Sequence, residues 1–441
     1  TMSPTFVSQI FNSIADTGRD LLDLGTGKTR NHSIEGLCRD LLTQKGEASG
    51  MALAREVVEV WAALSEKDQH DFFLFLDNEM SPDQARIDKA VSAYQMNQSP
   101  QNYQYLSAAI EAPRQELMRR VNFAPGGTAA IVGMRKYLVS QLKEYPQLKS
   151  VDNDLRHLLS SWFNRGFLSL ERIDWRTPAV ILEKLIEYEA VHEIDGWEDL
   201  RRRLDSDRRC FAFFHPALPD EPLIFVEVAL VKGLADAVQP LLQQEAERGD
   251  PRKADTAIFY SISNCQDGLK GISFGNFLIK QVVAELSTEL PNLKHFATLS
   301  PIPGFMKWLS SVKGKVGGIP FKEIGAAKSL LKEKEWFKSS SVMDQLKEPL
   351  EKLCAHYLVN EKSRERPLDP VARFHLGNGA RLEQLNWMGD KSANGLSQSA
   401  GLLVNYYYNS KHIERNHEAY ANERKVVASS SIQSLSKAGK K

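Results

Sequence analysis

The sequence predicts an α+β protein of more than one domain, in which an all-helical N-terminal bundle is followed by a mixed α/β part. Apolar residues recur at helical spacing through the first third of the chain, whereas short β-rich runs bounded by Pro, Asp and Gly occur only beyond about residue 160. The length of 441 residues suits two or three domains better than one core. We therefore expect domains at residues 1–158 and 159–441.

In the first domain, Leu53, Val57 and Trp61 recur at helical spacing and predict one long helix. The pairs Ser81-Pro82 and Ser99-Pro100 each offer a side-chain acceptor followed by a residue with a helical φ, so each is expected to begin another helix. No cluster of residues in this region points to chemistry. The first domain is therefore predicted to serve packing or assembly.

The second domain is predicted to contain strands at residues 210–215, 223–230 and 257–262, and an amphipathic helix at residues 277–290. Residues 310–341 are rich in Lys and Ser, and Gly314, Gly317 and Gly318 interrupt any regular pattern there. We expect this stretch to be an insertion with a solvated surface.

Composition limits the partners and the location. Lys and Arg number 56, as do Asp and Glu, so no overall charge attracts nucleic acid or an anionic membrane. No apolar run approaches the ~18 residues that span a bilayer, and neither end carries a recognisable targeting pattern, so a cytoplasmic location is expected. The four cysteines are scattered without a Cys-x-x-Cys pair, which predicts neither a zinc site nor a disulfide framework.

The most informative segment is a strand at residues 257–263, a loop at residues 266–276 and the helix that follows. Gly268, Gly271 and Gly275 would let the loop backbone approach a ligand, and a helix N-terminus attracts anions, so a pyrophosphate would fit there. A plain glycine-rich connection is equally compatible with these residues. The spacing matches neither the Rossmann nor the Walker pattern, so nucleotide hydrolysis is not predicted.

Two further positions are candidates for chemistry. Ser300 lies at the end of a predicted strand and precedes Pro301 and Pro303, which restrict the backbone around its hydroxyl. His375 lies between apolar neighbours just before a turn. Taken alone, the first residue would be a turn-forming serine and the second a structural histidine.

Several strings change this interpretation, because their order and spacing resemble those of the malonyl-CoA decarboxylase family. The resemblance extends over nearly the whole second domain, and the helical first third agrees in type and length. The strings are Leu158-Leu-Ser-Ser-Trp-Phe163, Gly166-Phe-Leu168, Ile258-Phe-Tyr-Ser-Ile-Ser263, Phe277-Leu-Ile-Lys280, Leu299-Ser-Pro-Ile-Pro-Gly-Phe305, Phe374-His-Leu376, Asn378-Gly-Ala380 and Val404-Asn-Tyr406.

The resemblance implies a helical oligomerisation domain, hence a homo-oligomer such as a dimer or tetramer, and a catalytic domain of the GNAT-type acyltransferase fold that binds coenzyme A. It implies that Ser300 and His375 are catalytic, with Asn386 and Tyr408 as supporting hydrogen-bond donors. It also implies an acyl-CoA binding loop made of Lys270, Gly271, Ile272, Ser273, Phe274, Gly275 and Asn276. Relatives can carry an acidic residue at the position of Ser273, and a role for that carboxylate does not transfer.

The implied reaction converts malonyl-CoA to acetyl-CoA and carbon dioxide. The thioester carbonyl of the substrate accepts the charge that decarboxylation leaves, so no cofactor and no metal are expected. His375 would deliver a proton because imidazole ordinarily titrates near neutrality, and Ser300 would hydrogen-bond the carboxylate or hold the histidine in register. The residues leave open which of the two protonates carbon.

Two alternatives remain on the residues alone. A GNAT-type acyl-CoA-dependent acyltransferase would move the acyl group to an amine, and would depend strictly on that acceptor. A non-catalytic CoA-binding scaffold would bind without turnover.

Overall fold

The computed structural model describes residues 4–25, 33–44, 46–272, 274 and 278–437. The chain forms two compact units. The helical unit comprises Thr1–Ser169 together with Phe214–Leu223 and Gln266–Phe274, and the sheet unit comprises Leu170–Phe213, Ile224–Cys265 and Gly275–Lys441. Two short segments from the second part of the sequence therefore fold with the helical unit. The domain boundary between residues 158 and 159 stays a prediction.

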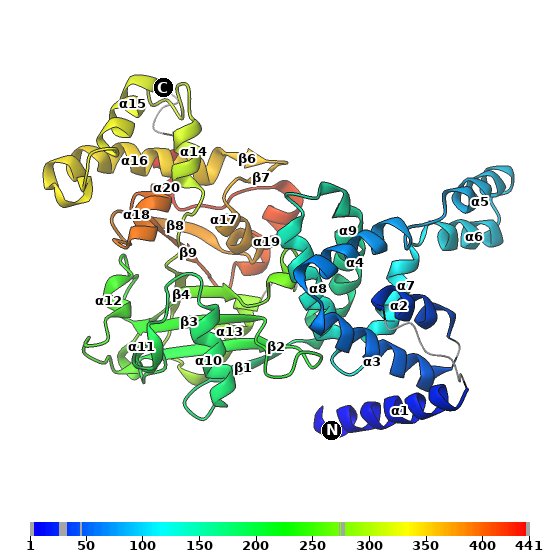
Figure 1. Ribbon diagram of the computed structural model, residues 1–441. Coiled ribbons are helices and arrows are strands. Elements are labelled where there is room, and N and C mark those ends of the chain that lie inside the picture. Colours follow the sequence, from blue (N-terminus) through cyan, green and yellow to red (C-terminus); the bar gives the residue numbers. More distant parts are fainter. Residues whose placement is uncertain (1–3, 26–32, 45, 273, 275–277, 438–441) are drawn as a thin grey trace. The chain divides into compact units, whose positions relative to one another are not determined.

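The helical unit is built from helices that bury apolar side chains, among them Trp61, Phe72, Phe73 and Leu117. Helices α5 and α6 pair with each other and project away from the remaining helices of the unit (Figure 1). The helices are α1 (Pro4–Gly25), α2 (Ile34–Thr43), α3 (Glu47–Ala63), α4 (Glu66–Asn78), α5 (Gln84–Met96), α6 (Pro100–Ile110), α7 (Pro113–Asn122), α8 (Gly127–Gln141) and α9 (Lys149–Trp162).

Side-chain caps fix where these helices begin. Ser99 accepts a hydrogen bond from the N–H of Asn102, and Pro100 is the first residue of α6, as the sequence predicts. The prediction that Ser81 caps the helix that follows it, α5, is wrong. Asp83 caps α5 instead, because its carboxylate accepts from the N–H groups of both Ala85 and Arg86.

The sheet unit is organised around a seven-stranded mixed sheet with the order β1-β2-β3-β4-β5-β9-β8 (Figure 1). Strands β4 and β5 are parallel, and the pairs β2/β3, β3/β4, β5/β9 and β8/β9 are antiparallel. The strands are β1 (Ser169–Ile173), β2 (Arg208–Phe214), β3 (Ile224–Val231), β4 (Thr256–Asn264), β5 (His295–Thr298), β8 (Arg381–Asn386) and β9 (Leu403–Tyr407). The predicted strands thus occur, and the predicted fold class of helices followed by a mixed domain is confirmed.

Helices surround this sheet, and a two-stranded ribbon of β6 (Lys362–Ser363) and β7 (Arg366–Pro367) joins two of them. No helix in the described part of the chain has the length and apolar character needed to cross a membrane. The helices are α10 (Ala179–Tyr188), α11 (Gly196–Arg203), α12 (Gln239–Leu242), α13 (Leu278–Glu289), α14 (Phe305–Ser311), α15 (Phe321–Leu330), α16 (Ser340–Asn360), α17 (Pro370–Gly377), α18 (Ala393–Ser399), α19 (Ile413–Glu423) and α20 (Ser430–Lys437).

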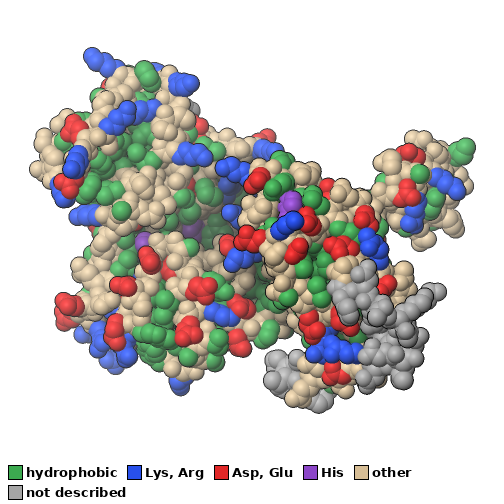
Figure 2. All heavy atoms as spheres, viewed as in Figure 1, with side chains coloured by type: hydrophobic (Ala, Val, Ile, Leu, Met, Phe, Trp, Pro, Cys, Tyr) green, Lys and Arg blue, Asp and Glu red, His purple; other side chains and the backbone are tan. Residues whose placement is uncertain are grey.

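The Lys- and Ser-rich stretch is more regular than the sequence suggests. It contains α15, whose Ile324 and Ala327 are buried, and α15 packs against α16. Its lysines Lys313, Lys315 and Lys322 are exposed, and Figure 2 shows basic side chains spread over this part of the surface, at the upper left. The expected solvated surface is present, but part of the stretch that carries it is a regular helix, α15.

A buried ion network fastens α11 to the sheet. The guanidinium of Arg203 donates to Glu227 on β3 at 2.9 Å and to both carboxylate oxygens of Asp199, at 3.2 and 3.1 Å. The side chains of Arg203 and Glu227 are each only 2% exposed. Burial raises the pKa of Glu227 to about 8, although Arg203 opposes this shift. The arginine is therefore needed to offset the burial of two carboxylates.

We predict that Arg203→Met lowers the free energy of unfolding by ~3–5 kcal/mol, because it leaves the buried acidic side chains of Asp199 and Glu227 without the cation that donates hydrogen bonds to both. Arg201 on the same helix is a matched control, because it is exposed, and its replacement by Met should cost less than about 1 kcal/mol. Urea denaturation followed by circular dichroism measures both. Equal stability of the two variants would contradict a structural role for the network.

Candidate active site

Strand pairing holds Ser300 in place. The N–H of Ser300 donates to the carbonyl of Val404 at 2.9 Å, and the N–H of Val404 donates to the carbonyl of Ser300 at 3.0 Å. This bridge keeps the antiparallel register of β5 with β9, in which Ala297 lies opposite Tyr407, three residues further along. On the other side of the strand, the N–H of Leu299 donates to the carbonyl of Phe259 on β4 at 2.9 Å, and Pro301, which has no N–H, cannot continue that pairing.

His375 reaches the same place from α17. Asp369 caps this helix by accepting from the N–H of Ala372 at 2.8 Å, and Pro370 is its first residue. The helix ends at Gly377, and just beyond its cap lies Gly379, where φ is +84° and an added Cβ would lie 2.2 Å from the carbonyl oxygen of Ile413. Only glycine fits there, so the position of His375 depends on a fixed helix start and a fixed helix end.

The two residues form the centre of a hydrogen-bonded chain. The Ser300 hydroxyl lies 3.2 Å from His375 Nε2 and donates to Thr298 Oγ1 at 2.8 Å. On the other side of the ring, His375 Nδ1 lies 2.8 Å from the hydroxyl of Tyr408. The imidazole also stacks on the ring of Tyr406, with centroids 4.5 Å apart. Both ring nitrogens and one ring face are thus constrained.

Burial sets the protonation state of this chain. Ser300 is 5% exposed and His375 is 3% exposed. Burial lowers the pKa of His375 to about 3, since the charged imidazolium is poorly solvated there. The expectation that this imidazole titrates near neutrality is therefore wrong, and the histidine is neutral at physiological pH.

A cavity of about 240 Å³ in the sheet unit opens onto Ser300 and His375. Its walls are mainly apolar, and none of the described residues that line it is Lys, Arg, Asp or Glu. The other lining residues are Val191, Phe259, Tyr260, Ile262, Asn264, Pro301, Pro370, Val371 and Phe374. The cavity therefore offers neutral hydrogen-bonding groups in an apolar setting.

The structure brings together three of the predicted site residues, Ser300, His375 and Tyr408. Asn386 is buried but is not among the lining residues of the cavity. Its amide donates to Asn405 Oδ1 at 2.8 Å. Asn405 in turn donates to the backbone carbonyl of Thr298 at 2.7 Å. Asn386 thus belongs to a layer that supports strand β5.

The predicted acyl-CoA loop is described in part. Lys270, Gly271, Ile272 and Phe274 belong to the helical unit, whereas Ser273, Gly275 and Asn276 lie outside the described residues. Gly271 has a φ of +78°, and a Cβ added to it would meet no atom within 4 Å. Gly268 differs, since its Cβ would lie 2.0 Å from the carbonyl oxygen of Val132. It approaches a helix, which the sequence reading did not anticipate.

The sequence did not single out Thr298, which contacts Ser300, or Tyr406, which contacts His375. Thr298 accepts hydrogen bonds from the Ser300 hydroxyl and from the N–H of Tyr406, at 2.8 and 3.1 Å. A usable signal existed, because residues two apart on a strand face the same side, so a hydroxyl at 298 should accompany one at 300. Tyr406 and Tyr408 follow the same rule on β9 and just beyond it.

Comparison with known families covers most of the chain. The model of the malonyl-CoA decarboxylase C-terminal domain matches residues 166–441, and that of the malonyl-CoA decarboxylase N-terminal domain matches residues 80–163. The two matches meet near residue 165, between α9 and β1.

Individual relatives agree with these matches. Mitochondrial malonyl-CoA decarboxylase from Mus musculus is 36% identical over 426 residues, which is 91% of this chain and 85% of the relative. The protein from Anser anser anser is 41% identical over 356 residues, 75% of this chain and 70% of the relative. The crystal structure of malonyl-CoA decarboxylase from Rhodopseudomonas palustris matches with a TM-score of 0.88 and 50% identity, covering 91% of this chain and 98% of that one. With both domain models matched over residues 80–163 and 166–441, this chain belongs to the malonyl-CoA decarboxylase family.

Proposed function

We propose that this protein is a carboxy-lyase that converts malonyl-CoA to acetyl-CoA and carbon dioxide without an acyl-enzyme intermediate. The observation that carries the proposal is a neutral Ser300–His375 pair facing an apolar cavity without charged lining residues. Membership of the decarboxylase family supports the same reaction.

The character of the cavity suits decarboxylation. Before reaction the substrate carries a localised carboxylate charge, whereas in the transition state that charge spreads toward the thioester carbonyl. An apolar environment without a Lys or Arg disfavours the localised charge more than the dispersed one, so it lowers the barrier. The hydroxyl and imidazole N–H groups can still hydrogen-bond the oxygen of the forming enolate.

The rival acyltransferase fits less well. Transfer to an amine needs a base that removes a proton from the acceptor, and a catalytic base works best with a pKa near the operating pH. A histidine whose pKa burial lowers to about 3 is a weak base for that task. The scaffold alternative gives no reason for a cavity with a serine and a histidine in hydrogen-bonding distance.

We assign Ser300 and His375 to orienting the carboxylate, stabilising the enolate and relaying one proton from water, since a neutral imidazole can give up its N–H proton only while its other nitrogen takes one up. Tyr408 holds the ring through Nδ1, and Thr298 orients the serine hydroxyl. An ester on Ser300 would stabilise an adjacent carbanion less well than the thioester already present, so direct decarboxylation is the simpler route. Asn386 acts through Asn405 and β5.

Residues 270–276 are proposed to hold the pyrophosphate of coenzyme A, and the helical unit is proposed to form a dimer or tetramer. The open space beside Gly271 supports the first assignment.

A cytoplasmic location also remains a proposal, to be tested by cell fractionation, since the goose and mouse relatives are named as mitochondrial.

The decisive assay mixes the purified protein with malonyl-CoA alone and follows acetyl-CoA by mass spectrometry. Product should form without any amine acceptor and in the presence of a chelator. In heavy water it should carry deuterium at the acetyl methyl group, because protonation follows loss of carbon dioxide. Strict dependence on an amine would favour the acyltransferase, and binding without turnover would favour the scaffold.

We predict that Ser300→Ala and His375→Asn each lower kcat by ~10²–10⁴, because each removes a positioned hydrogen-bonding group or proton donor. Affinity for coenzyme A should be kept. Ser399→Ala is a matched control, because Ser399 is buried in the same unit but is not among the lining residues of the cavity. Steady-state kinetics with folded variants checks this, and near-normal kcat in either site variant would remove that residue from the mechanism.

Stability should depend on pH through His375. Its folded pKa of about 3 lies below the ordinary value of ~6.5, so below pH ~6.5 the unfolded chain binds a proton that the folded chain does not. The free energy of unfolding should therefore fall as the pH drops from ~6.5 toward 3, by up to about 1.4 kcal/mol per pH unit from this group. His375→Asn should show a shallower fall in denaturation at several pH values. Parallel curves would contradict a buried neutral histidine.

A further inference from the structure

One buried arginine of the helical unit donates hydrogen bonds to the loop that contains Gly268 and Gly271, here called the glycine loop. Arg135 on α8 is 2% exposed, and its guanidinium donates to the carbonyl of Gly268 at 2.7 Å and to that of Lys270 at 3.0 Å. Its Nε donates to Asp152 on α9 at 2.8 Å. Two helices therefore fix two carbonyl groups of the loop through one side chain.

Backbone packing makes the attachment closer still. Val132 lies one turn before Arg135 on the same face of α8, and its carbonyl oxygen would be 2.0 Å from a Cβ at Gly268. The loop can lie this near the helix only because residue 268 has no side chain. Arg135 and Gly268 thus act together at one contact.

The contact of Arg135 with the Lys270 carbonyl sets the direction in which the Gly271 N–H points. The chain has no cis peptide bonds, and in a trans peptide the C=O and the following N–H point in opposite directions. Because the Lys270 carbonyl points at Arg135, the Gly271 N–H points away from it. No described residue accepts a hydrogen bond from that N–H, and the space beside Gly271 is open. A phosphate oxygen is a suitable acceptor for such a donor.

We propose that Arg135 is a positioning residue for the phosphate-bearing part of the acyl-CoA substrate. It holds the Lys270–Gly271 peptide so that the Gly271 N–H faces the ligand. The helical unit then takes part in substrate binding as well as in assembly. This inference rests on the proposed role of residues 270–276 in binding coenzyme A.

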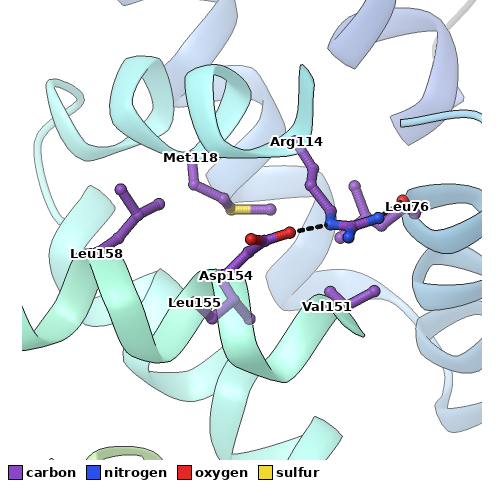
Figure 3. Close-up of a pocket in the computed structure, with 7 residues that line it drawn as sticks. All are labelled: Leu76, Arg114, Met118, Val151, Asp154, Leu155 and Leu158. Carbon is purple, nitrogen blue, oxygen red and sulfur yellow. Dashed lines mark hydrogen bonds and ion pairs between the residues drawn. The ribbon is translucent and has the colours of Figure 1, made fainter. Parts of the chain in front are cut away.

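The helical unit supplies a matched control. Arg114 on α7 is 5% exposed, donates to Asp154 on α9 at 2.6 Å and reaches the carbonyl of Leu76 at 3.1 Å. Figure 3 shows this pair beside a small cavity lined by Leu76, Met118, Val151, Leu155 and Leu158. Arg114 thus has the same chemistry, burial and type of partner, but its hydrogen bonds go to Asp154, Leu76 and Ser81 and not to the loop.

The test compares Arg135→Lys with Arg114→Lys. Lysine keeps the charge but lacks the planar fork that reaches two carbonyls and a carboxylate together. Both variants should lower the melting temperature. Only Arg135→Lys should raise KM for malonyl-CoA and Kd for coenzyme A, by roughly tenfold or more, since a bound conformation of the loop is no longer held. Its kcat at saturation should stay within about threefold of the parent value.

Unchanged KM and Kd in Arg135→Lys, or an equal increase in both variants, would overturn the inference. If Arg135→Lys does not fold, Asp152→Asn replaces it, because that change weakens the anchor of Arg135 and should raise KM in the same direction. Unchanged KM in Asp152→Asn would then overturn it. If the parent protein fails to decarboxylate malonyl-CoA while Kd for coenzyme A rises only in Arg135→Lys, the proposed reaction fails and the inference stands.

Discussion

The pairing of β5 with β9 is the constraint on which the site depends. Residues 300, 375 and 408 are far apart in sequence, and they converge because the end of β5 bridges Val404. That single alignment places Ser300 beside Val404 on β9, and the imidazole that contacts the Ser300 hydroxyl stacks on Tyr406 of β9 and contacts the hydroxyl of Tyr408 just beyond that strand. A shift by one residue would turn the serine to the opposite face of the sheet and separate the pair.

Burial without charge gives this site its chemical character. Many catalytic histidines keep a carboxylate partner that favours the imidazolium, whereas the Nδ1 partner of His375 is the phenol of Tyr408. A phenol orients the ring without stabilising its charge, so burial alone determines the pKa. The result is a neutral hydrogen-bonding chain, which suits a reaction whose substrate brings its own charge and its own electron sink.

The helical unit has a larger part in this design than a bundle for assembly would need. Segments 214–223 and 266–274 fold with it, although they come from the second part of the sequence. The second of these contains the glycine loop, and the contact of Gly268 with α8 explains one glycine by packing, not by access to a ligand. Glycines that looked alike in sequence therefore have different physical reasons.

The sequence by itself determined the order of helices and strands and the family, and it proposed Ser300 and His375 as the reactive pair, because periodicity, capping residues and matching strings are local properties. It identified Ser300 and His375 but gave His375 an ordinary pKa, since burial is not encoded in neighbouring letters. It proposed Asn386 for the substrate, although this amide supports β5 through Asn405. Only the tertiary structure decided the hydrogen-bonded chain from Thr298 to Tyr408 and the attachment of the loop to Arg135, because both depend on contacts between segments distant in the chain.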